Sequence, residues 1–374
     1  MPEQQMMVSI LAGGASQRFK SNKKQPDKAL ARINGQYILE RMIINLAPLA
    51  SRLNIITNHH TRQLKYQQII SSLPSKRIED SIKQKICWFV DSPSIVCSGP
   101  LKGAITSMQE NFPINITAPC DTPFLSAEVL SILNSFLSKE ISTVVPLWSS
   151  GRLEPQIVAY RKNRIFPSVQ SLTHLKRSRI DDLIRASPKV AFVDIEKTFS
   201  HLGSVDLLFA NINRPEDLNR WKKDITFSQR PYNLDPYISN NDLQTDSYVI
   251  QLLEKKHKLL LEDLTQWACT VLHKDRVDFL SQLANRFLDE RCYFWAGIIY
   301  QLLCHQGYNN FEDNQKNAFL MEMDFWEKHK IYFLGLHAAQ DALLSSSGSR
   351  NDERIIVKLE KFRSLMNMKR EDKK

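Results

Sequence analysis

Residues 7–14 of the chain read Met-Val-Ser-Ile-Leu-Ala-Gly-Gly. The run Met7–Leu11 is mostly apolar and contains β-branched side chains, which favours a β-strand. Gly13 and Gly14 follow this run after a single residue, Ala12. Because glycine has no Cβ, backbone N–H groups at such a corner can approach a ligand closely. The stretch therefore predicts a strand that ends in a ligand-facing corner, although a glycine pair by itself can also be a plain turn.

The segment 1–224 alternates short β-branched runs with amphipathic stretches, in which apolar residues recur at spacings of three and four. The stretches Tyr37–Leu49, Leu101–Gln109 and Ala127–Leu137 are predicted helices, the last with Ser126 as its N-cap. This alternation predicts an α/β fold, with a mostly parallel sheet and helices on both faces. The predicted strands are Met7–Leu11, Leu53–Thr57, Ile86–Val90, Ile114–Thr117, Thr143–Pro146, Gln156–Tyr160 and Val190–Asp194.

The composition changes after Trp221. Residues 225–246 contain two prolines, several asparagines and little periodicity, as a linker does. From Ser247 onward the pattern is helical, which predicts an all-α C-terminal domain built as a bundle or hairpin stack. We expect a first domain at 1–224, a linker at 225–246 and a helical domain of unknown role at 247–374. The predicted helices are Tyr248–Leu272, Arg276–Glu290, Cys292–Cys304, Lys316–His329, Ile331–Leu344 and Glu353–Met368.

Basic charge is concentrated in the first part of the chain. Residues 1–224 carry a net charge of +11, and residues 225–374 carry −1. Such an excess raises the local concentration of polyanions such as nucleoside triphosphates and phosphate esters, although a merely solvated basic surface would have the same charge. The chain has no zinc-finger, basic-zipper or RNP pattern, so nucleic acid is not an expected partner.

Other features of the composition are typical of a cytoplasmic protein. No stretch reaches the roughly 18 consecutive apolar residues that a membrane span needs, and the N-terminus lacks the pattern of a signal peptide. The six cysteines show no paired spacing, which fits a reducing compartment. We therefore expect a cytoplasmic location and no membrane partner.

A second predicted strand end carries an acidic side chain between two prolines. Residues 119–123 read Pro-Cys-Asp-Thr-Pro, soon after the strand Ile114–Thr117. Proline restricts the backbone, and Mg²⁺ in proteins takes few carboxylates together with substrate phosphates. Asp121 is therefore a candidate magnesium ligand, although it could instead cap the turn that follows. Ligands of open α/β sheets bind beyond the carboxyl ends of the strands, where both motifs fall.

Positive side chains follow the glycine pair. Arg18 and Lys28, the second of them within Asp-Lys-Ala-Leu at 27–30, would supply charge to a triphosphate. The pattern is not a P-loop, because no Gly-Lys-Ser or Gly-Lys-Thr opens the next helix.

In their order along the chain, these motifs resemble those of the molybdenum cofactor guanylyltransferases, a family of Rossmann-like nucleotidyltransferases. The resemblance covers about residues 7–222 and rests on six matches in the same order. The strongest are Leu-Ala-Gly-Gly at 11–14, Arg18 with Asp-Lys-Ala-Leu at 27–30, and Pro-Cys-Asp-x-Pro at 119–123. The weaker ones are Asp91 followed by Gly99-Pro100-Leu101 and Gly103, then Glu154-Pro155-Gln156-Ile157, and Asn211–Leu218.

The resemblance implies a reaction and a site. The enzyme would transfer GMP from GTP to the terminal phosphate of molybdenum-molybdopterin, giving the guanine dinucleotide cofactor and pyrophosphate. Arg18, Lys28 and Asp121 would be the catalytic residues: the first two neutralise phosphate charge, and Asp121 binds Mg²⁺, the expected cofactor. The backbone of the glycine corner would recognise guanine. The implied nucleotide-binding residues are Leu11, Ala12, Gly13, Gly14, Lys28, Asn58, Asp91 and Asp121.

The chain departs from the family pattern in one loop. Residues 19–26, Phe-Lys-Ser-Asn-Lys-Lys-Gln-Pro, form a longer connection without the family's glycines, which removes close backbone approach to phosphate. Two alternatives therefore stay open. One is a related cytidylyl- or sugar-phosphate nucleotidyltransferase. The other is a catalytically weak nucleotide- or cofactor-binding adaptor, whose helical domain docks molybdoenzymes or cofactor-insertion proteins.

Two further segments have both a functional and a structural interpretation. The run Lys-Arg-Ser-Arg at 176–179 could hold the phosphate of the pterin or be a solvated helix start. The segment Asn211–Leu218 is most simply a helix entry, with Asn213 as cap and Pro215 in the first turn.

Overall fold

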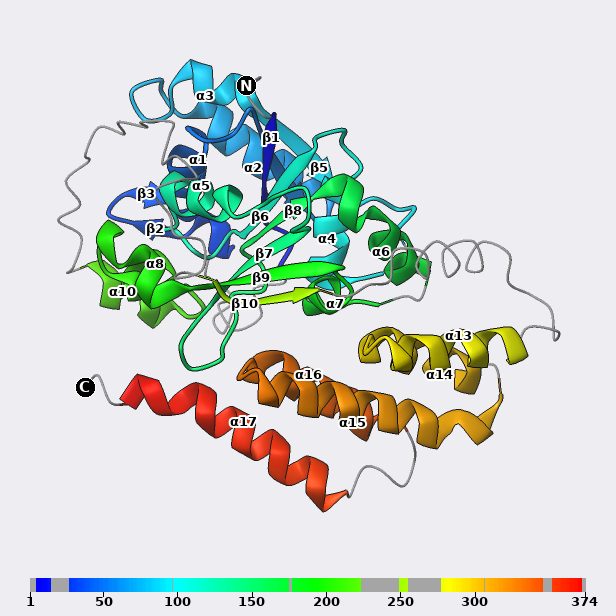
Figure 1. Ribbon diagram of the computed structural model, residues 1–374. Coiled ribbons are helices and arrows are strands. Elements are labelled where there is room, and N and C mark those ends of the chain that lie inside the picture. The colour runs from blue at the N-terminus through cyan, green and yellow to red at the C-terminus, as the bar shows by residue number, and fades with distance from the viewer. Residues whose placement is uncertain are drawn as a thin grey trace.

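An eight-stranded sheet with the strand order β10-β9-β7-β8-β6-β1-β4-β5 forms the centre of the computed structural model (Figure 1). The structure describes residues 5–14, 27–95, 97–174, 177–222, 249–254, 277–305, 307–345 and 352–371. The strands of this sheet are β1 (Met6–Leu11), β4 (Arg52–Thr57), β5 (Ile86–Val90), β6 (Ile114–Pro119), β7 (Thr143–Leu147), β8 (Val158–Arg161), β9 (Lys189–Asp194) and β10 (Val249–Glu254).

The sheet is mostly parallel, as expected. The pairs β1–β4, β1–β6, β4–β5 and β7–β9 run parallel. Strand β8 is antiparallel to both β6 and β7, and β10 is antiparallel to β9. All seven predicted strands are confirmed. The sequence pattern did not predict the small hairpin of β2 (Arg32–Ile33) and β3 (Gln36–Tyr37).

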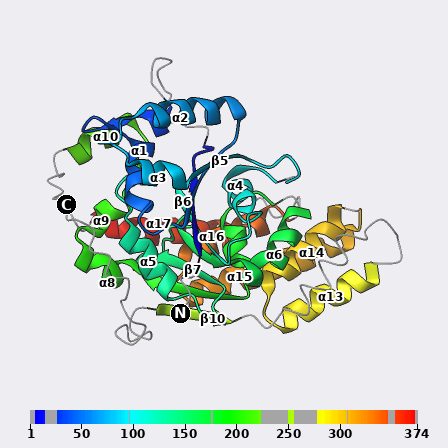
Figure 2. The same ribbon diagram turned by 90° about the horizontal axis from the view of Figure 1, so that it is seen from above.

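Helices cover both faces of the sheet, which confirms the predicted α/β class. Helices α4 (Gly99–Ser107), α6 (Lys162–His174) and α7 (Asp181–Arg185) contribute to one apolar core. Helices α1 (Ile38–Leu46), α2 (His60–Ser72) and α5 (Ala127–Ser135) contribute to a second one. Figure 2 shows α4 and α6 on one side of the strands and α1 and α5 on the other. The shorter helices are α3 (Asp80–Lys85), α8 (Ile195–Phe199), α9 (Val205–Leu208) and α10 (Pro215–Lys222).

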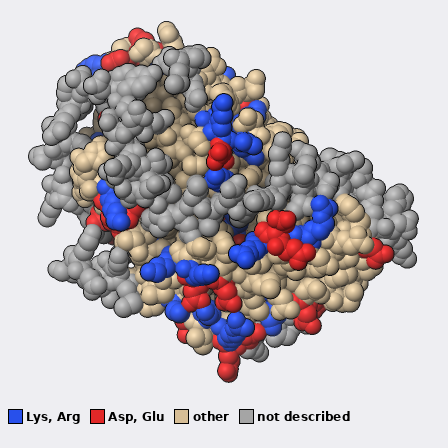
Figure 3. Space-filling model, in the orientation of Figure 1, with Lys and Arg blue, Asp and Glu red and all other residues tan. Residues whose placement is uncertain are grey.

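The C-terminal part is helical, and each helix packs chiefly against its neighbours in sequence. The helices are α13 (Val277–Asp289), α14 (Tyr293–His305), α15 (Glu312–Lys328), α16 (Tyr332–Leu343) and α17 (Glu353–Glu371). Acidic and basic side chains lie next to one another on the visible face of this region (Figure 3). Among the ion pairs of these helices, Glu327 of α15 pairs with Lys358 and Lys361 of α17.

The predicted helix Tyr248–Leu272 is wrong over residues 249–254, which form the edge strand β10. The sequence Val-Ile-Gln-Leu-Leu-Glu suits either a helix or a strand, and pairing with β9 decides between them, since strand formation depends strongly on tertiary context. Residues 255–276 lie outside the described part, as does the predicted linker. The domain boundaries therefore stay a prediction.

The C-terminal helices share an apolar core with one face of the sheet. This core contains Phe192 of β9 together with Trp326 of α15, whose rings meet edge to face at 6.1 Å. The region thus packs on the same face as α4, α6 and α7. Among the described residues, no helix combines the length and the apolar character needed to cross a membrane.

Candidate active site

A pocket of about 420 Å³ lies beyond the carboxyl ends of the central strands. Strand register explains its position, because Leu11 at the end of β1 pairs with Ile56 of β4 and with Pro119 of β6. The residues that follow these strands must then lie side by side. The predicted residues that line the pocket are Leu11, Ala12, Gly13, Gly14, Lys28, Asn58, Asp91 and Asp121. Arg18 lies outside the described residues.

The glycine corner fits tightly against the end of β4. The amide of Ala12 donates a hydrogen bond of 2.7 Å to the carbonyl of Ile56. A Cβ at Gly13 would lie 3.1 Å from the backbone nitrogen of Asn58, so this position has little room for a side chain. A Cβ at Gly14 would meet no described atom within 4 Å. A side chain at Gly13 would therefore press on the Asn58 backbone, whereas no described atom would obstruct one at Gly14.

Arg62 of α2 holds this corner in place, and sequence reasoning missed it. Its Nη1 donates to the carbonyl oxygens of Gly13 (3.0 Å) and Gly14 (3.1 Å), and to Oδ1 of Asn58 (2.7 Å). Its Nε lies 3.0 Å from a carboxylate oxygen of Asp27. One guanidinium group thus connects the corner, the end of β4 and the residue that precedes Lys28. It lies on a mostly polar helix in which only Tyr66 and Ile70 are buried, so its place in the sequence gave no signal.

Lys28 and Asp121 form an ion pair inside the pocket. The Nζ–Oδ2 distance is 2.6 Å, and the side chains are 15% and 25% exposed. The Asp27 carboxylate caps the short helical turn Lys28–Leu30 by accepting from the amide of Ala29 at 3.4 Å. The amide of Ile212 donates to the Asp121 carbonyl at 2.8 Å, which brings the segment before α10 to the pocket rim.

Asn213 has a different role from the expected helix cap. Its Oδ1 accepts a hydrogen bond of 3.1 Å from Nζ of Lys28. Asp217 instead provides the capping carboxylate, because its Oδ2 accepts from the amides of Asn213 (2.7 Å) and Arg214 (2.8 Å). Asn213 therefore belongs to the candidate site, and the capping prediction is wrong for this residue.

Asp91 follows β5 at the side of the pocket formed by α4. Its amide donates to the carbonyl of Thr57 at 2.8 Å. Burial raises the pKa of the Asp91 carboxyl, and the positive charges of Lys102 and His59 partly offset this effect. A Cβ at Gly103 would lie 3.3 Å from Leu11 and 3.5 Å from Oδ1 of Asp91, so a small residue lets α4 approach the strand ends.

Cys120 lies next to Asp121 but does not have the properties of a nucleophile. Burial raises the pKa of its thiol well above the ordinary value, and the negative charge of Asp121 adds to this effect. The thiol is therefore protonated near neutral pH, whereas nucleophilic cysteines are thiolates. The side chain is buried in an apolar core, as expected for a packing residue.

One carboxylate atom in the pocket is suited to a cation. Oδ1 of Asp121 is buried and has no hydrogen-bond partner among the described residues. The same residues contain no group of three or more His, Cys, Asp or Glu side chains that could hold a metal ion. A single carboxylate oxygen of this kind fits Mg²⁺, which takes its remaining ligands from water and substrate phosphates.

Known proteins resemble the first part of the chain. Residues 8–190 match the family model of the MobA-like NTP transferase domain. A protein named probable molybdenum cofactor guanylyltransferase, from Halalkalibacterium halodurans, is 34% identical over 215 residues, which are 57% of this chain and 95% of that protein. A protein of the same name from Carboxydothermus hydrogenoformans is 30% identical over 222 residues, 59% of this chain and 96% of that protein.

Solved structures show the same coverage. Molybdopterin-guanine dinucleotide biosynthesis protein A from Archaeoglobus fulgidus is 20% identical, with a TM-score of 0.45 over 59% of this chain and 98% of that one. The C-terminal helices lie beyond residues 8–190 and thus outside the family match.

Proposed function

This chain belongs to the molybdenum cofactor guanylyltransferase family of nucleotidyltransferases, and from this premise we propose that it transfers GMP from GTP to the terminal phosphate of molybdenum-molybdopterin. The products are the guanine dinucleotide cofactor and pyrophosphate. One observation carries the proposal. The eight described residues predicted to bind nucleotide come from separate parts of the sequence, and they all line one pocket.

The glycine corner is suited to recognising the base. Arg62 binds the carbonyl oxygens of Gly13 and Gly14 and so fixes the backbone of the corner. None of the described atoms would lie within 4 Å of a Cβ at Gly14, so the described part of the chain leaves a planar ring access to the backbone there. A polar edge of guanine can then meet backbone N–H and C=O groups directly, which is how small numbers of fixed polar groups give a pocket its specificity.

The reaction needs two anions aligned in one pocket. A terminal phosphate oxygen of the pterin forms a bond to the α-phosphorus of GTP, while the bond from this phosphorus to the oxygen bridging to the β-phosphorus breaks. Pyrophosphate leaves with the electron pair of the broken bond. The protein contributes alignment and charge rather than covalent chemistry.

Lys28 and Asp121 have complementary tasks in this step. Lys28 is already held by Asp121 and Asn213, and its ammonium group lies in the pocket where the phosphates would add negative charge. Asp121 would hold Mg²⁺ through Oδ1, which accepts no hydrogen bond from the described residues. When bound, the metal ion offsets charge on the transferring group. Arg18 is proposed to add a second positive charge.

The proposal is tested by pyrophosphate release from GTP in the presence of Mg²⁺ and molybdenum-molybdopterin. Asp121→Ala should lower the rate at least about a hundredfold, because it removes the proposed metal ligand. Asp80→Ala is the matched control, since Asp80 pairs with Lys83 in α3 and does not line the pocket. Faster turnover with CTP than with GTP would show that the chain transfers CMP instead of GMP. Equal, negligible rates for wild type and Asp121→Ala would favour a binding module instead.

A further inference from the structure

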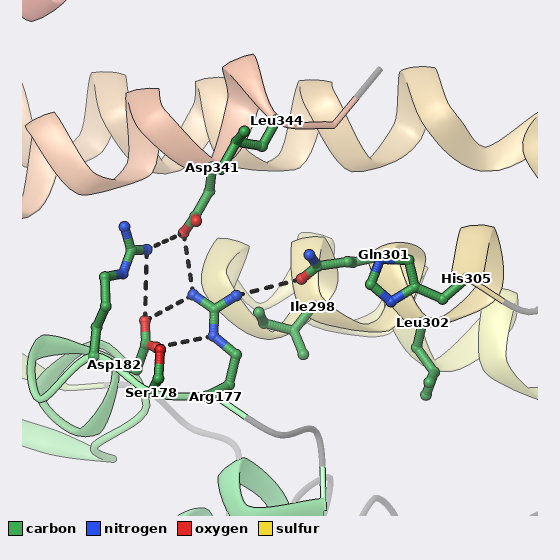
Figure 4. Close-up of a pocket in the computed structure, with 10 residues that line it drawn as sticks. Arg177, Ser178, Asp182, Ile298, Gln301, Leu302, His305, Asp341 and Leu344 are labelled. Atoms are coloured by element: carbon green, nitrogen blue, oxygen red, sulfur yellow. Dashed lines mark hydrogen bonds and ion pairs between the residues drawn. The ribbon is translucent and has the colours of Figure 1, made fainter. Parts of the chain in front are cut away.

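A second cavity, of about 530 Å³, lies where residues 177–182 meet helices α14 and α16 (Figure 4). Arg177 reaches it from the segment that leads into α7, Asp182 reaches it from α7 itself, and Asp341 points toward both from α16. The cavity thus lies between the transferase part of the chain and the C-terminal helices.

The arginines at this junction are already neutralised. Arg177 forms two hydrogen bonds of 2.9 Å with the carboxylate of Asp182, and its Nη2 is 3.3 Å from Asp341. Nη2 of Arg179 lies 2.5 Å from the same oxygen of Asp341. The run 176–179 therefore does not offer these two guanidinium groups to a phosphate. Lys176, the remaining cation of the run, lies outside the described residues.

A third arginine lies beneath these pairs and is completely buried. Arg185 donates from Nε and Nη2 to the two carboxylate oxygens of Glu322, at 2.8 and 2.6 Å, and from Nη1 to Asp341 at 2.8 Å. Three guanidinium groups thus share one oxygen of Asp341. Removing one partner of a buried ion pair is costly, because it leaves an uncompensated charge. These contacts consequently fix the position of residues 177–185 against α15 and α16.

The same segment touches the nucleotide pocket on its other side. A Cβ at Gly99 would lie 3.2 Å from the carbonyl oxygen of Ser178. Gly99 begins α4, lines the nucleotide pocket and has a φ of +69°, a conformation that favours glycine. Residues 177–179 therefore lie between the two cavities, with Ser178 lining one and Gly99 the other.

A second contact connects the same helices with the pocket. The amide of Phe333 in α16 donates to the carbonyl of Gly151 at 3.1 Å. Gly151 has no room for a side chain, because a Cβ there would collide with the carbonyl of Lys330. The loop that contains Gly151 leads to Gln156, which lines the nucleotide pocket.

We propose that the helical region 277–345 is a built-in support of the transferase, which holds residues 177–179 against Gly99 and so sets the shape of the nucleotide pocket. Asp341 and Glu322 are its positioning residues, and both lie outside the family match of residues 8–190. The inference rests on the proposed function, since it concerns the pocket assigned there to GTP. It gives these carboxylates an internal role instead of a role in docking another protein.

The principal test is Asp341→Asn in the full chain. The amide keeps the shape of the side chain but removes the charge that three arginines share. We expect faster hydrogen–deuterium exchange in residues 97–107 and 177–185. We also expect the KM for GTP to rise about tenfold, within the range of couplings between distant sites, while kcat changes less than about twofold. A general loss of folded protein would lower the active fraction and leave KM unchanged.

Three further variants make the test specific. Glu327→Gln is the matched control, because Glu327 lies on the same helix as Glu322 but pairs with Lys358 and Lys361 of α17. It should change neither exchange in residues 97–107 nor KM. Asp341→Glu restores the charge and should recover most of the affinity. Arg179→Met removes one partly exposed link of the network, and it replaces the principal test if Asp341→Asn does not fold.

The outcomes separate this inference from the proposed function. Unchanged exchange and unchanged KM in a folded Asp341→Asn or Arg179→Met protein would overturn the inference. A wild-type chain that binds no GTP would overturn the proposed function. In that case, hydrogen–deuterium exchange in residues 97–107, compared between wild type and Asp341→Asn, still tests whether the C-terminal helices position α4.

Discussion

Arg62 and Asp27 form an ion pair of 3.0 Å in which both side chains are about seven-eighths buried, at 13% and 14% exposure. Asp27 directly precedes Lys28, and Arg62 also binds the carbonyl oxygens of the glycine corner. The pair therefore couples two parts of the pocket that have separate tasks in the proposed reaction. In the proposed site the corner would hold the base and Lys28 would lie beside the phosphates, so Arg62 would set the distance between these two subsites.

The first prediction concerns Arg62→Lys. An ammonium group cannot reproduce the planar arrangement of donors with which Arg62 contacts four acceptors. We expect the KM for GTP to rise about tenfold, as expected when substrate-positioning contacts are lost. Steady-state pyrophosphate release measures this. The matched control is Arg164→Lys, because exposed Arg164 also donates to a backbone carbonyl, that of Lys139, but outside the pocket. Equal effects of the two substitutions would contradict a positioning role.

The second prediction contrasts the two glycines of the corner. Gly13→Ala forces a Cβ to within 3.1 Å of the Asn58 backbone, so the corner must shift, and both thermal stability and GTP affinity should fall. Gly14→Ala places its methyl group in space that is open among the described atoms. Its melting temperature should stay within about 2 °C of wild type, since surface substitutions change stability little, while GTP affinity falls about tenfold.

Calorimetric titration with GTP, together with thermal unfolding of each variant, measures both quantities. Normal GTP affinity in Gly14→Ala would show that the nucleotide does not approach this residue. It would thereby remove the main support for base recognition by the corner.

The sequence predicted the elements whose signals are local. Each of the seven strands has a short β-branched run, and Leu11 and Pro119 end neighbouring strands, so the motifs after them had to meet at one edge. Long-range contacts left no such signal. Arg185 and Glu322 are 137 positions apart, and neither residue belongs to a recognisable motif. Strand β10 was missed for the same reason, because the exposed edge of β9 determines its conformation.

The last prediction concerns pH and Asp91. Burial raises the pKa of this carboxyl in the folded protein above its value in the unfolded chain, where the side chain is solvated. Between these two pKa values the folded state binds more protons than the unfolded state, so ionisation of Asp91 lowers stability as the pH rises through this window. Asp91→Asn cannot ionise and avoids this loss. The variant should therefore become more stable relative to wild type as the pH rises, and the difference should level off above the raised pKa.

Thermal unfolding of both proteins from about pH 4 to pH 8 measures this difference, since the ordinary pKa of aspartate is near 4. The same substitution should weaken GTP binding, because Asp91 lines the pocket and is proposed to contact the nucleotide. An Asp91→Asn variant that is more stable than wild type but binds GTP more weakly is the result expected if Asp91 is buried at a cost in stability because it is needed for function. A difference in melting temperature that is constant across the pH range would show that burial does not raise the pKa of Asp91 in the folded protein.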